Sequence, residues 1–322
     1  MEIFVIGCGV SGLSCGIRLL ERGAAVTIIS EKLPPQTTSN VAPAFWYPFK
    51  AYPLGRVQRW SRISLHEFYR LMAVSETGVS ATTLVELYPT PVSAPWWAGL
   101  VRSCRPIPGQ ELPPGYQAGF QAEVPLIETP FYMPYLLTRF RQLGGQVEQQ
   151  HISRLSDLIK PGRLIVNCTG LSAREIVGDE AVYPIRGQIV RVRQPNLGQR
   201  IVNALSGDAL TYIVPRSQDC ILGGTAQEHD WNLDVKPDTA AAIVQRAQML
   251  EPVLAQAEVL EHVVGLRPGR KEVRLELEQV AADSAVIHNY GHGGAGFTLS
   301  WGCAQEVAEL AAGFVAGQGH SL

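Results

Sequence analysis

The sequence contains no long hydrophobic run; its apolar stretches fall well short of the roughly 20 residues that a membrane-spanning helix needs. Charged residues are also few, at 17% against a typical share of about 25%, and 27 Lys and Arg nearly balance 29 Asp and Glu. A surface that binds nucleic acid or an anionic membrane needs clustered basic residues. We therefore expect no nucleic-acid or membrane partner. The 322 residues correspond to about two compact domains.

The chain has no CxxC pair, the usual spacing of zinc sites and redox-active dithiols. Its six cysteines are dispersed: Cys8, Cys15, Cys104, Cys168, Cys220 and Cys303. Dispersed thiols in a long chain favour reduced cysteines, and hence a reducing compartment, over a disulfide framework. The cytoplasm is the default expectation. His288 and His292 lie four residues apart, but Gly291 intervenes and a third ligand is lacking, so we expect polar loop contacts and no metal.

The N-terminal segment has the pattern of a strand, a helix and a second strand. Glu2–Ile6 and Ala25–Ile29 are short apolar runs rich in β-branched residues. Between them, the apolar residues of Val10–Arg22 recur at helical spacing and share one face. The sequence therefore predicts a βαβ unit.

A GxGxxG motif lies between the first strand and the helix, at Gly7, Gly9 and Gly12, and Glu31 follows nineteen residues after Gly12. In a βαβ unit such glycines permit a tight turn and bring backbone close to a pyrophosphate at the helix N-terminus. An acidic residue at this distance accepts hydrogen bonds from ribose hydroxyls. The motif predicts a dinucleotide site, without distinguishing NAD from FAD.

The rest of the chain alternates between this domain and a second one. The expected elements are a helix at Phe131–Leu143, strands at Arg163–Cys168, Ile185–Arg193, Ala209–Val214, Asp219–Leu222 and Ala285–Asn289, and helices at Pro237–Leu250 and from Gly296. Residues 34–60 and 87–114 lack periodicity and are expected to form loops. We predict an α/β fold. One domain comprises residues 1–45, 131–175 and 281–322, and the other comprises residues 46–130 and 176–280.

Two further features suggest a redox site. Gly291–Gly296 carries four glycines in six positions directly before a predicted helix, so bare backbone could meet a flat ring. The helix N-terminus and the Thr298 hydroxyl could then stabilise negative charge on that ring. Arg267 and Arg270 flank a turn, and a guanidinium binds a carboxylate bidentately. A surface ion pair is the alternative for either arginine, and a core position is the alternative for the strand residue Tyr212.

Several motifs occur together in one order along nearly the whole chain. They are Gly7–Gly12 with Glu31, Thr37–Ala42 with Trp46, Val166–Gly170, Arg186–Ile189, Tyr212–Pro215, Leu222–Gly224, Gly265–Pro268 and His288–Ala304. In these motifs the chain resembles the FAD-dependent D-amino acid oxidases and D-aspartate oxidases. The resemblance implies a Rossmann-like FAD-binding domain made of discontinuous segments. It also implies a substrate domain with a large mixed, mostly antiparallel sheet.

The resemblance also implies site residues. Arg267 would pair with the substrate carboxylate, Tyr212 would donate its hydroxyl to the same group, and the Gly294 carbonyl would receive the amino group. The residues implied to bind FAD are Gly7, Gly9, Val10, Ser11, Gly12, Glu31, Thr37, Thr38, Ser39, Ala42, Ile152, Thr169, Gly170, Arg186, Gly187, Gln188, Gly293, Ala295, Gly296, Phe297 and Thr298.

The implied reaction is oxidative deamination of a D-amino acid, with neutral side chains preferred. Hydride passes from the substrate Cα to flavin N5, the imino acid hydrolyses to a 2-oxo acid and ammonia, and dioxygen reoxidises the flavin to give hydrogen peroxide. The alternatives are oxidation of D-aspartate or D-glutamate, oxidation of glycine, and a flavin dehydrogenase with another electron acceptor. Family members are often dimers, so a homodimer stays open.

The chain departs from better-known members of the family in two places. The segment 203–211 before Tyr212 is shorter than in mammalian members, and Asp208 falls where some of them carry a second tyrosine. Lys50, Arg56 or Arg216 could attract an acidic substrate side chain, although we expect each of them to be an exposed charge instead.

Overall fold

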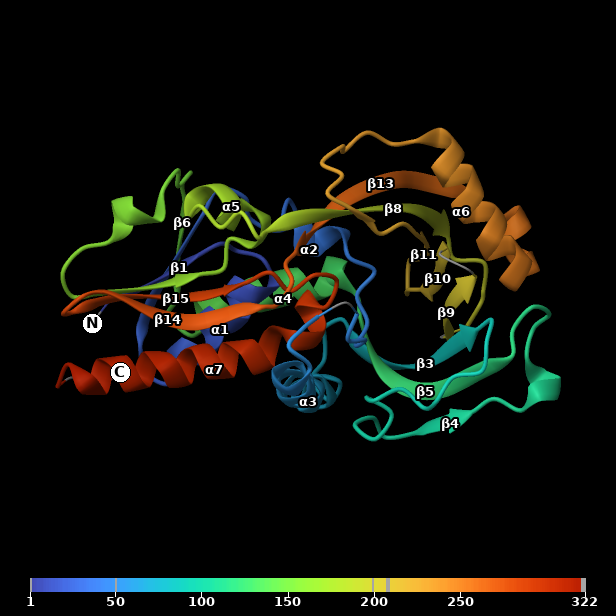
Figure 1. Cartoon of the computed structure of the whole chain (residues 1–322), viewed down its shortest axis with the longest axis horizontal. Helices are drawn as coiled ribbons and strands as arrows, with labels where there is room; N and C mark the ends of the chain where they lie inside the picture. Colours follow the sequence, from blue (N-terminus) through green and yellow to red (C-terminus); the bar gives the residue numbers. More distant parts are fainter. Residues whose placement is uncertain (1, 50, 199, 207–208, 320–322) are drawn as a thin grey trace. The chain divides into compact units, whose positions relative to one another are not determined.

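The computed structural model describes residues 2–49, 51–198, 200–206 and 209–319 (Figure 1). The chain separates into two compact units, each made of several segments. The first unit comprises Met1–Val79, Thr129–Pro184 and Arg267–Leu322, and the second comprises Ser80–Glu128 and Ile185–Leu266. This division differs from the predicted boundaries, which placed residues 46–79, 129–130, 176–184 and 267–280 with the second domain.

The first unit is built on a six-stranded sheet. In sheet order its strands are β14 (Arg274–Ala281), β15 (Ser284–Tyr290), β7 (Arg163–Asn167), β1 (Glu2–Ile6), β2 (Ala25–Ser30) and β6 (Gln146–Gln149). Five of the strands run parallel, and β14 is antiparallel to β15. The central strands are buried almost throughout because helices cover a parallel sheet. The unit therefore has the doubly wound arrangement expected from the βαβ pattern.

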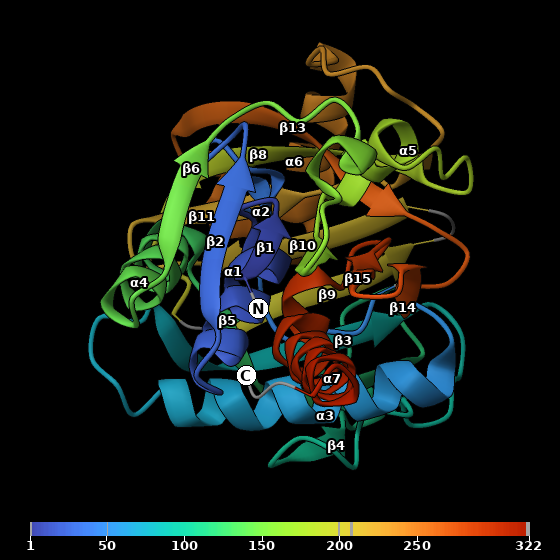
Figure 2. The same cartoon turned by 90° about the vertical axis from the view of Figure 1, so that its left-hand side faces the viewer.

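The helices of the first unit are of two sizes. The longer ones are α1 (Val10–Leu20), α3 (Leu54–Leu71), α4 (Thr129–Gln142) and α7 (Gly296–Gly317), and the short ones are α2 (Thr38–Val41) and α5 (Ala173–Ile176). The first unit also contains short 3₁₀ turns at Leu155–Leu158 and Gly170–Ser172, and another lies in the second unit at Gly109–Glu111. Helix α7 packs against both α1 and α3, and Figure 2 shows it running across α3.

Helix α3 corrects the expectation of a loop through residue 60. Its buried face includes Ser61, Ser64 and Glu67 beside apolar residues. Two of them have partners in the fold: the Ser64 Oγ accepts the Gly302 N–H at 3.0 Å, and the Glu67 carboxylate pairs with Arg18 at 3.0 Å. Because three of its eight buried residues are polar, the apolar positions that mark the buried face of a helix are interrupted in the sequence.

The second unit is built on a nine-stranded sheet. In order its strands are β12 (Gln227–Glu228), β8 (Tyr183–Arg193), β11 (Asp219–Gly223), β10 (Ala209–Pro215), β9 (Arg200–Ser206), β3 (Val79–Tyr88), β5 (Ala118–Ile127) and β4 (Cys104–Pro106), with β13 (Val259–Gly269) paired to β8. The β3–β9 pair is parallel, whereas β9–β10, β10–β11 and β11–β8 are antiparallel. The sheet is therefore mixed, as predicted.

A hydrophobic core lies between this sheet and α6 (Pro237–Leu250), followed by the 3₁₀ turn Pro252–Gln256. Strand residues Val190, Ile213 and Leu222 pack there against Ile243 and Leu254. The amphipathic pattern of Pro237–Leu250 predicted this helix correctly, because one face meets the sheet and the other meets solvent.

Two features, a membrane-spanning helix and a cluster of metal ligands, are absent from the described residues. No helix among them is long and apolar enough to cross a membrane. Nor do three His, Cys, Asp or Glu side chains gather there in a way that could hold a metal ion.

Candidate active site

The GxGxxG loop is shaped by contacts that leave no room for side chains. Gly7 has φ +106°, and a Cβ on it would lie 2.5 Å from the Cys168 carbonyl oxygen. A Cβ on Gly12 would lie only 1.9 Å from the Gly7 carbonyl oxygen. Both distances are far inside van der Waals contact, so the passage from β1 into α1 requires glycine at these two positions.

The N-terminus of α1 suits a pyrophosphate. Its N-cap residue, Gly9, has no side chain to cap the helix, and the first amide of the helix, on Val10, donates to the Ser39 Oγ at 3.0 Å. The following amides, on Ser11 and Gly12, precede the first intrahelical bond, which the Leu13 amide makes to the Gly9 carbonyl. Backbone donors at a positive helix end, lined by a hydroxyl, fit the diphosphate of FAD.

The hydroxyl of Ser39 is brought to this loop by α2, whose N-cap is Thr37. The Thr37 Oγ1 bonds to the Asn40 side chain at 2.7 Å. The Asn40 carbonyl in turn accepts the Thr129 hydroxyl at 3.2 Å, which ties this segment to the start of α4. The predicted residues Thr37, Thr38 and Ser39 therefore lie on one turn, and Ser39 meets the pyrophosphate loop.

Glu31 follows β2 with a largely exposed carboxylate, as a ribose-binding acid requires. The His151 Nδ1 lies 3.1 Å from its Oε2, and the Gln149 side chain donates to its backbone carbonyl. Ile152 is buried next to Phe4, Ile6 and Ile29. Ile152, which follows β6, therefore packs against β1 and against the end of β2 that precedes Glu31.

The C-terminal glycine cluster adjoins the predicted substrate-binding arginine. The Gly293 amide donates to the Pro268 carbonyl at 2.8 Å, so the residue after Arg267 is bonded to the residue before Gly294. A Cβ on Gly170 would lie 3.9 Å from the Pro268 ring. The structure thus brings together three segments that the sequence named separately: Thr169–Gly170, Arg267 and Gly294.

The expected turn around Arg267 is wrong: Arg267 lies within β13, and Arg270, which directly follows this strand, has a structural partner. The Arg270 Nε donates to the Asp179 carboxylate at 3.0 Å, and its Nη1 donates to the Glu272 carbonyl at 2.9 Å. Of the two arginines that the sequence left as alternatives, Arg270 is therefore committed to an ion pair inside the first unit.

The start of α7 lies beside the residues that follow α2. Ala295, the N-cap, gives no side-chain cap, so the first amides of α7 are available to a ligand. The Thr298 hydroxyl donates to the Tyr47 carbonyl at 2.9 Å and accepts the Tyr47 amide at 3.0 Å. This hydroxyl is therefore occupied by protein backbone, and any contribution of Thr298 to a flavin would come from its amide. Phe49 covers Gly294, where an added Cβ would lie 2.5 Å from its ring.

Neither histidine of the cluster lies in an exposed loop. His288 is in β15, where its Nε2 lies 3.0 Å from the Glu278 carboxylate and its Nδ1 lies 3.2 Å from the Asn167 amide. The His292 Nε2 lies 3.0 Å from the Asn289 Oδ1, and burial lowers the His292 pKa to about 4. A buried imidazole with that pKa is neutral at pH 7.

In the second unit, Tyr212 lies on β10 opposite Gly223 of β11. A Cβ on Gly223 would lie 2.0 Å from the tyrosine ring, and one on Gly224 would lie 2.6 Å from its hydroxyl. The two glycines thus provide the space that the ring occupies. Gly223 in turn pairs with Ile189 of β8, so the register places Tyr212 near the Arg186–Gln188 segment.

The side chains of Arg186 and Gln188 have a role that the sequence did not show. The fully buried Arg186 guanidinium donates to the Asn232 carbonyl at 2.7 Å and to the Asp234 carbonyl at 2.6 Å. The Gln188 Nε2 donates to the Lys236 carbonyl at 2.8 Å. Both side chains therefore hold residues 232–236, and the backbone of residues 186–188 is itself bonded to Thr225, whose Oγ1 accepts the Gln188 amide at 2.9 Å.

Two of the charged residues singled out in the sequence, Arg216 and Arg56, are paired in the structure. Arg216 was expected to be exposed but is buried, with two 2.6 Å bonds to the Asp219 carboxylate. Arg56 donates to Glu306 and to the Leu275 carbonyl. Neither guanidinium is available for an acidic substrate. Lys50 and Asp208 lie outside the described residues.

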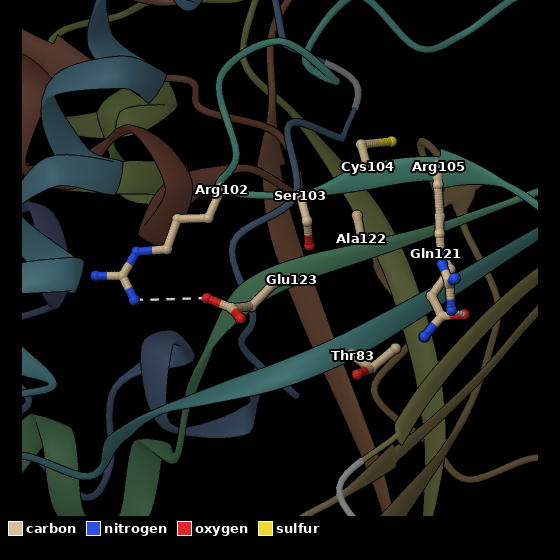
Figure 3. A pocket seen from close by; sticks show the side chains of 8 residues that line it. All are labelled: Thr83, Arg102, Ser103, Cys104, Arg105, Gln121, Ala122 and Glu123. Carbon is tan, nitrogen blue, oxygen red and sulfur yellow. Dashed lines mark hydrogen bonds and ion pairs between the residues drawn. The ribbon is translucent and has the colours of Figure 1, made fainter.

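The second unit also carries an open depression of about 510 Å³, shown in Figure 3. It is lined by Thr83, Arg102, Ser103, Cys104, Arg105, Gln121, Ala122 and Glu123. Arg102 and Glu123 form an ion pair of 3.5 Å across it. None of the predicted site residues lines this depression, so it is separate from the candidate active site.

The chain combines a glycine-lined pyrophosphate loop on a doubly wound unit with a second unit built on a mixed sheet. This combination indicates the class of protein to which the chain belongs. The family model described as FAD dependent oxidoreductase matches residues 2–310, and the chain belongs to this family. The predicted fold class and the dependence on FAD are therefore confirmed, and the protein is an oxidoreductase.

Particular members of the family are similar over almost the whole chain. D-amino-acid oxidase from Rubrobacter xylanophilus is 48% identical over 95% of this chain and 94% of its own. D-aspartate oxidase from Homo sapiens is 36% identical over 96% of this chain and 94% of its own. The structure of glycine oxidase from Bacillus cereus superposes with a TM-score of 0.81 over 97% of this chain and 95% of that one, at 21% identity, which shows the shared fold.

Proposed function

We propose that the protein oxidises D-amino acids with neutral side chains to 2-oxo acids, ammonia and hydrogen peroxide. The observation that carries this proposal is the Gly293–Pro268 hydrogen bond. This bond joins the residues next to Arg267 and Gly294, and so supports a site in which Arg267 would bind a carboxylate and the Gly294 carbonyl would accept an amine. A group that binds a carboxylate and a group that accepts an amine, side by side at a flavin-binding loop, match an α-amino acid.

Each residue would act by holding the substrate. The Arg267 guanidinium would pair with the carboxylate through two parallel hydrogen bonds. The Tyr212 hydroxyl would donate to the same carboxylate, and the Gly294 carbonyl would accept a hydrogen from the α-amine. These contacts define which face of the α-carbon is presented, and hence which enantiomer reacts.

The backbone amides of α1, with Ser39 and Glu31, would hold the dinucleotide part of FAD, and the amides at the start of α7 would face its ring. When bound, FAD supplies the acceptor for the hydride from the substrate Cα and passes the electrons to dioxygen. The protein then needs no catalytic acid–base pair, because a substrate with a neutral amine reacts once it is oriented.

The preference for neutral side chains is supported by the state of the nearby charges. Phe49 presents an aromatic ring at Gly294. Arg56 and Arg216, which could have attracted an acidic side chain, are paired with Glu306 and Asp219. D-aspartate stays as the second candidate because of the 36% identity to human D-aspartate oxidase.

We further infer a cytoplasmic location and a homodimer. All six cysteines are free thiols, which supports a reducing compartment. Light scattering of the purified protein would test the dimer, and a mass of one chain at all concentrations would exclude it.

The decisive experiment is anaerobic titration of the purified holoprotein with D-alanine, L-alanine, glycine and D-aspartate in separate cuvettes. We expect D-alanine to bleach the flavin absorption, and air to restore it with release of hydrogen peroxide. Bleaching chiefly by D-aspartate or by glycine would transfer the protein to one of the alternative substrate classes. Bleaching by D-alanine with little peroxide after air would indicate a dehydrogenase, and a band unmoved by all four would refute the proposal.

A further inference from the structure

A carboxylate outside every motif of the sequence lies at the centre of the hydrogen bonds around the proposed substrate site. The Asp179 side chain, 10% exposed, accepts the Tyr290 hydroxyl at 2.8 Å and the Arg270 Nε at 3.0 Å. Its other oxygen accepts the Ala181 amide at 3.1 Å. Burial by itself would raise the Asp179 pKa, but the three donors, one of which is the charged Arg270, favour the ionised form, so this pKa lies below its usual range.

The two side chains bound to Asp179 flank the proposed substrate-binding groups. Arg270 comes three residues after Arg267, and Tyr290 comes four residues before Gly294. Tyr290 is fully buried and is itself held by Arg274, whose Nη1 donates to the Tyr290 hydroxyl at 2.8 Å. One carboxylate therefore fixes the chain on both sides of the site.

The two segments are also in direct contact. Gly291 has φ +80°, and a Cβ on it would lie 2.8 Å from the Arg270 Cβ, so the arginine stem rests on this glycine. A few residues away, the Gly293 amide bonds to the Pro268 carbonyl. The Asp179 ion pair holds Arg270 on one side of this contact, and the Gly293–Pro268 bond closes the other.

We propose that Asp179 is a positioning residue that sets the spacing between the Arg267 guanidinium and the Gly294 carbonyl. This inference rests on the proposed function, because the spacing matters only if these two groups hold the two ends of an α-amino acid. Asp179 does not touch the substrate; it acts through Arg270 and Tyr290. Small errors in position are costly in such a site, since misplacement by about 1 Å can lower a rate about 100-fold.

Ligands that bind both the Arg267 guanidinium and the Gly294 carbonyl should respond to a change in their spacing, whereas ligands that bind only one of these groups should not. D-alanine presents a carboxylate to Arg267 and an amine to Gly294, whereas propanoate presents only the carboxylate. A change in spacing therefore weakens binding of D-alanine and leaves binding of propanoate nearly unchanged. A general loss of structure would weaken both.

The test uses the FAD-loaded Asp179→Asn protein, which keeps the size of the side chain but removes its charge and one of its two acceptor oxygens, so the three bonds to Asp179 cannot all form. Stopped-flow reduction by D-alanine gives an apparent Kd and a limiting rate, and the flavin spectrum reports the Kd of propanoate. We expect the apparent Kd of D-alanine to rise about tenfold and that of propanoate to change less than about threefold. Equal increases for both ligands, or no increase for either, would overturn the inference.

Two further variants separate positioning from stability. Arg270→Gln should reproduce the effect, and the double variant should be no worse than either single one, because both changes break the same link. Asp219→Asn is the matched control: this buried carboxylate is likewise paired with arginine, in this case Arg216 and Arg191, but in the second unit. It should lower stability and leave the D-alanine to propanoate ratio unchanged.

Failure of this inference is distinguishable from failure of the proposed function. If the wild-type flavin is not reduced by D-alanine, the substrate assignment fails before Asp179 is tested. If the wild type is reduced and the Asp179→Asn protein has the same ratio of Kd values, only the positioning role is refuted.

Discussion

At the scale of single residues, the role of an arginine in this protein depends on the partner that the fold gives it. Arg186 holds a segment of backbone, Arg216 closes an ion pair, and Arg270 binds Asp179. Nothing in their local sequences separates these roles from the proposed role of Arg267. Its assignment comes from the resemblance and from its position next to the Pro268–Gly293 bond.

Replacing Arg267 tests this assignment. We expect Arg267→Ala to keep its bound FAD and to lose at least about 100-fold in kcat/KM for D-alanine. Removing one partner of a desolvated ion pair costs about 3 to 5 kcal/mol. Steady-state peroxide release measures the loss, and the flavin spectrum checks that cofactor is retained. Arg102→Ala, at the edge of the open depression, is the control and should keep wild-type activity; normal turnover of Arg267→Ala would disprove the role.

His292 makes stability depend on pH in a defined direction. Its native pKa is about 4, against about 6.5 in the unfolded chain, so between these values the unfolded chain binds a proton that the native protein does not. The free energy of unfolding therefore falls as the pH drops through this window. For a shift of this size the loss at pH 4 is about 3 kcal/mol.

Urea denaturation of the holoprotein at pH 7, 5.5 and 4.5 measures this dependence. His292→Gln, which can still hydrogen-bond Asn289 but does not titrate, should lose less stability than the wild type between pH 7 and 4.5. Parallel pH profiles for the two proteins would show that His292 is not the titrating group.

At the scale of elements, close packing of helices decides which glycines matter. Helix α7 crosses α3 at Gly302, where an added Cβ would lie 2.3 Å from the Trp60 backbone. In the same helix, a Cβ on Gly313 would meet nothing within 4 Å. The two glycines thus have the same helix propensity, but only Gly302 lies in a tight contact between helices.

Two alanine substitutions in α7 test this contrast by chemical denaturation. Gly313→Ala should raise the free energy of unfolding by about 0.5 to 1 kcal/mol, because alanine loses less backbone entropy than glycine in a helix. Gly302→Ala should lower it by about 1 to 3 kcal/mol, because the methyl group forces α3 and α7 apart. Similar effects of the two substitutions would contradict the packing of these helices.

At the scale of the whole molecule, folding and cofactor binding are coupled. The GxGxxG loop exists only in the folded first unit, so FAD binds the native state and stabilises it by mass action. This coupling depends on Gly12, because the Gly7 carbonyl leaves no space for a side chain at this position of the loop.

Thermal and urea unfolding with and without FAD measure this coupling. FAD at about 100 times its Kd should add about 2.7 kcal/mol to the wild-type free energy of unfolding. Gly12→Ala should lose most of this gain, whereas Gly55→Ala, where an added Cβ would meet nothing within 4 Å, should keep it. An equal gain in Gly12→Ala would show that FAD does not bind at this loop.

Much of the first unit was predictable because its signals are local. Buried parallel strands are continuous apolar runs, and the glycines of the loop recur at short, fixed spacing. Helix α3 was missed because Ser61, Ser64 and Glu67 share its buried face. The mixed sheet was predicted only in part: β3, β5 and β13 were not identified, although β8, β10 and β11 were.

The sequence by itself determined the βαβ unit, the cofactor loop, the interleaving of two domains and, through its motifs, the family. Only the tertiary structure decided which polar side chains meet. Asp179 binds Arg270 and Tyr290 across 91 and 111 residues, and Arg186 binds the Asn232 carbonyl across 46. The apolar periodicity that predicts a helix or a strand can be seen in a short stretch of neighbouring residues. A hydrogen bond between distant residues exists only after the backbone has folded, and its geometry leaves no trace in the local sequence.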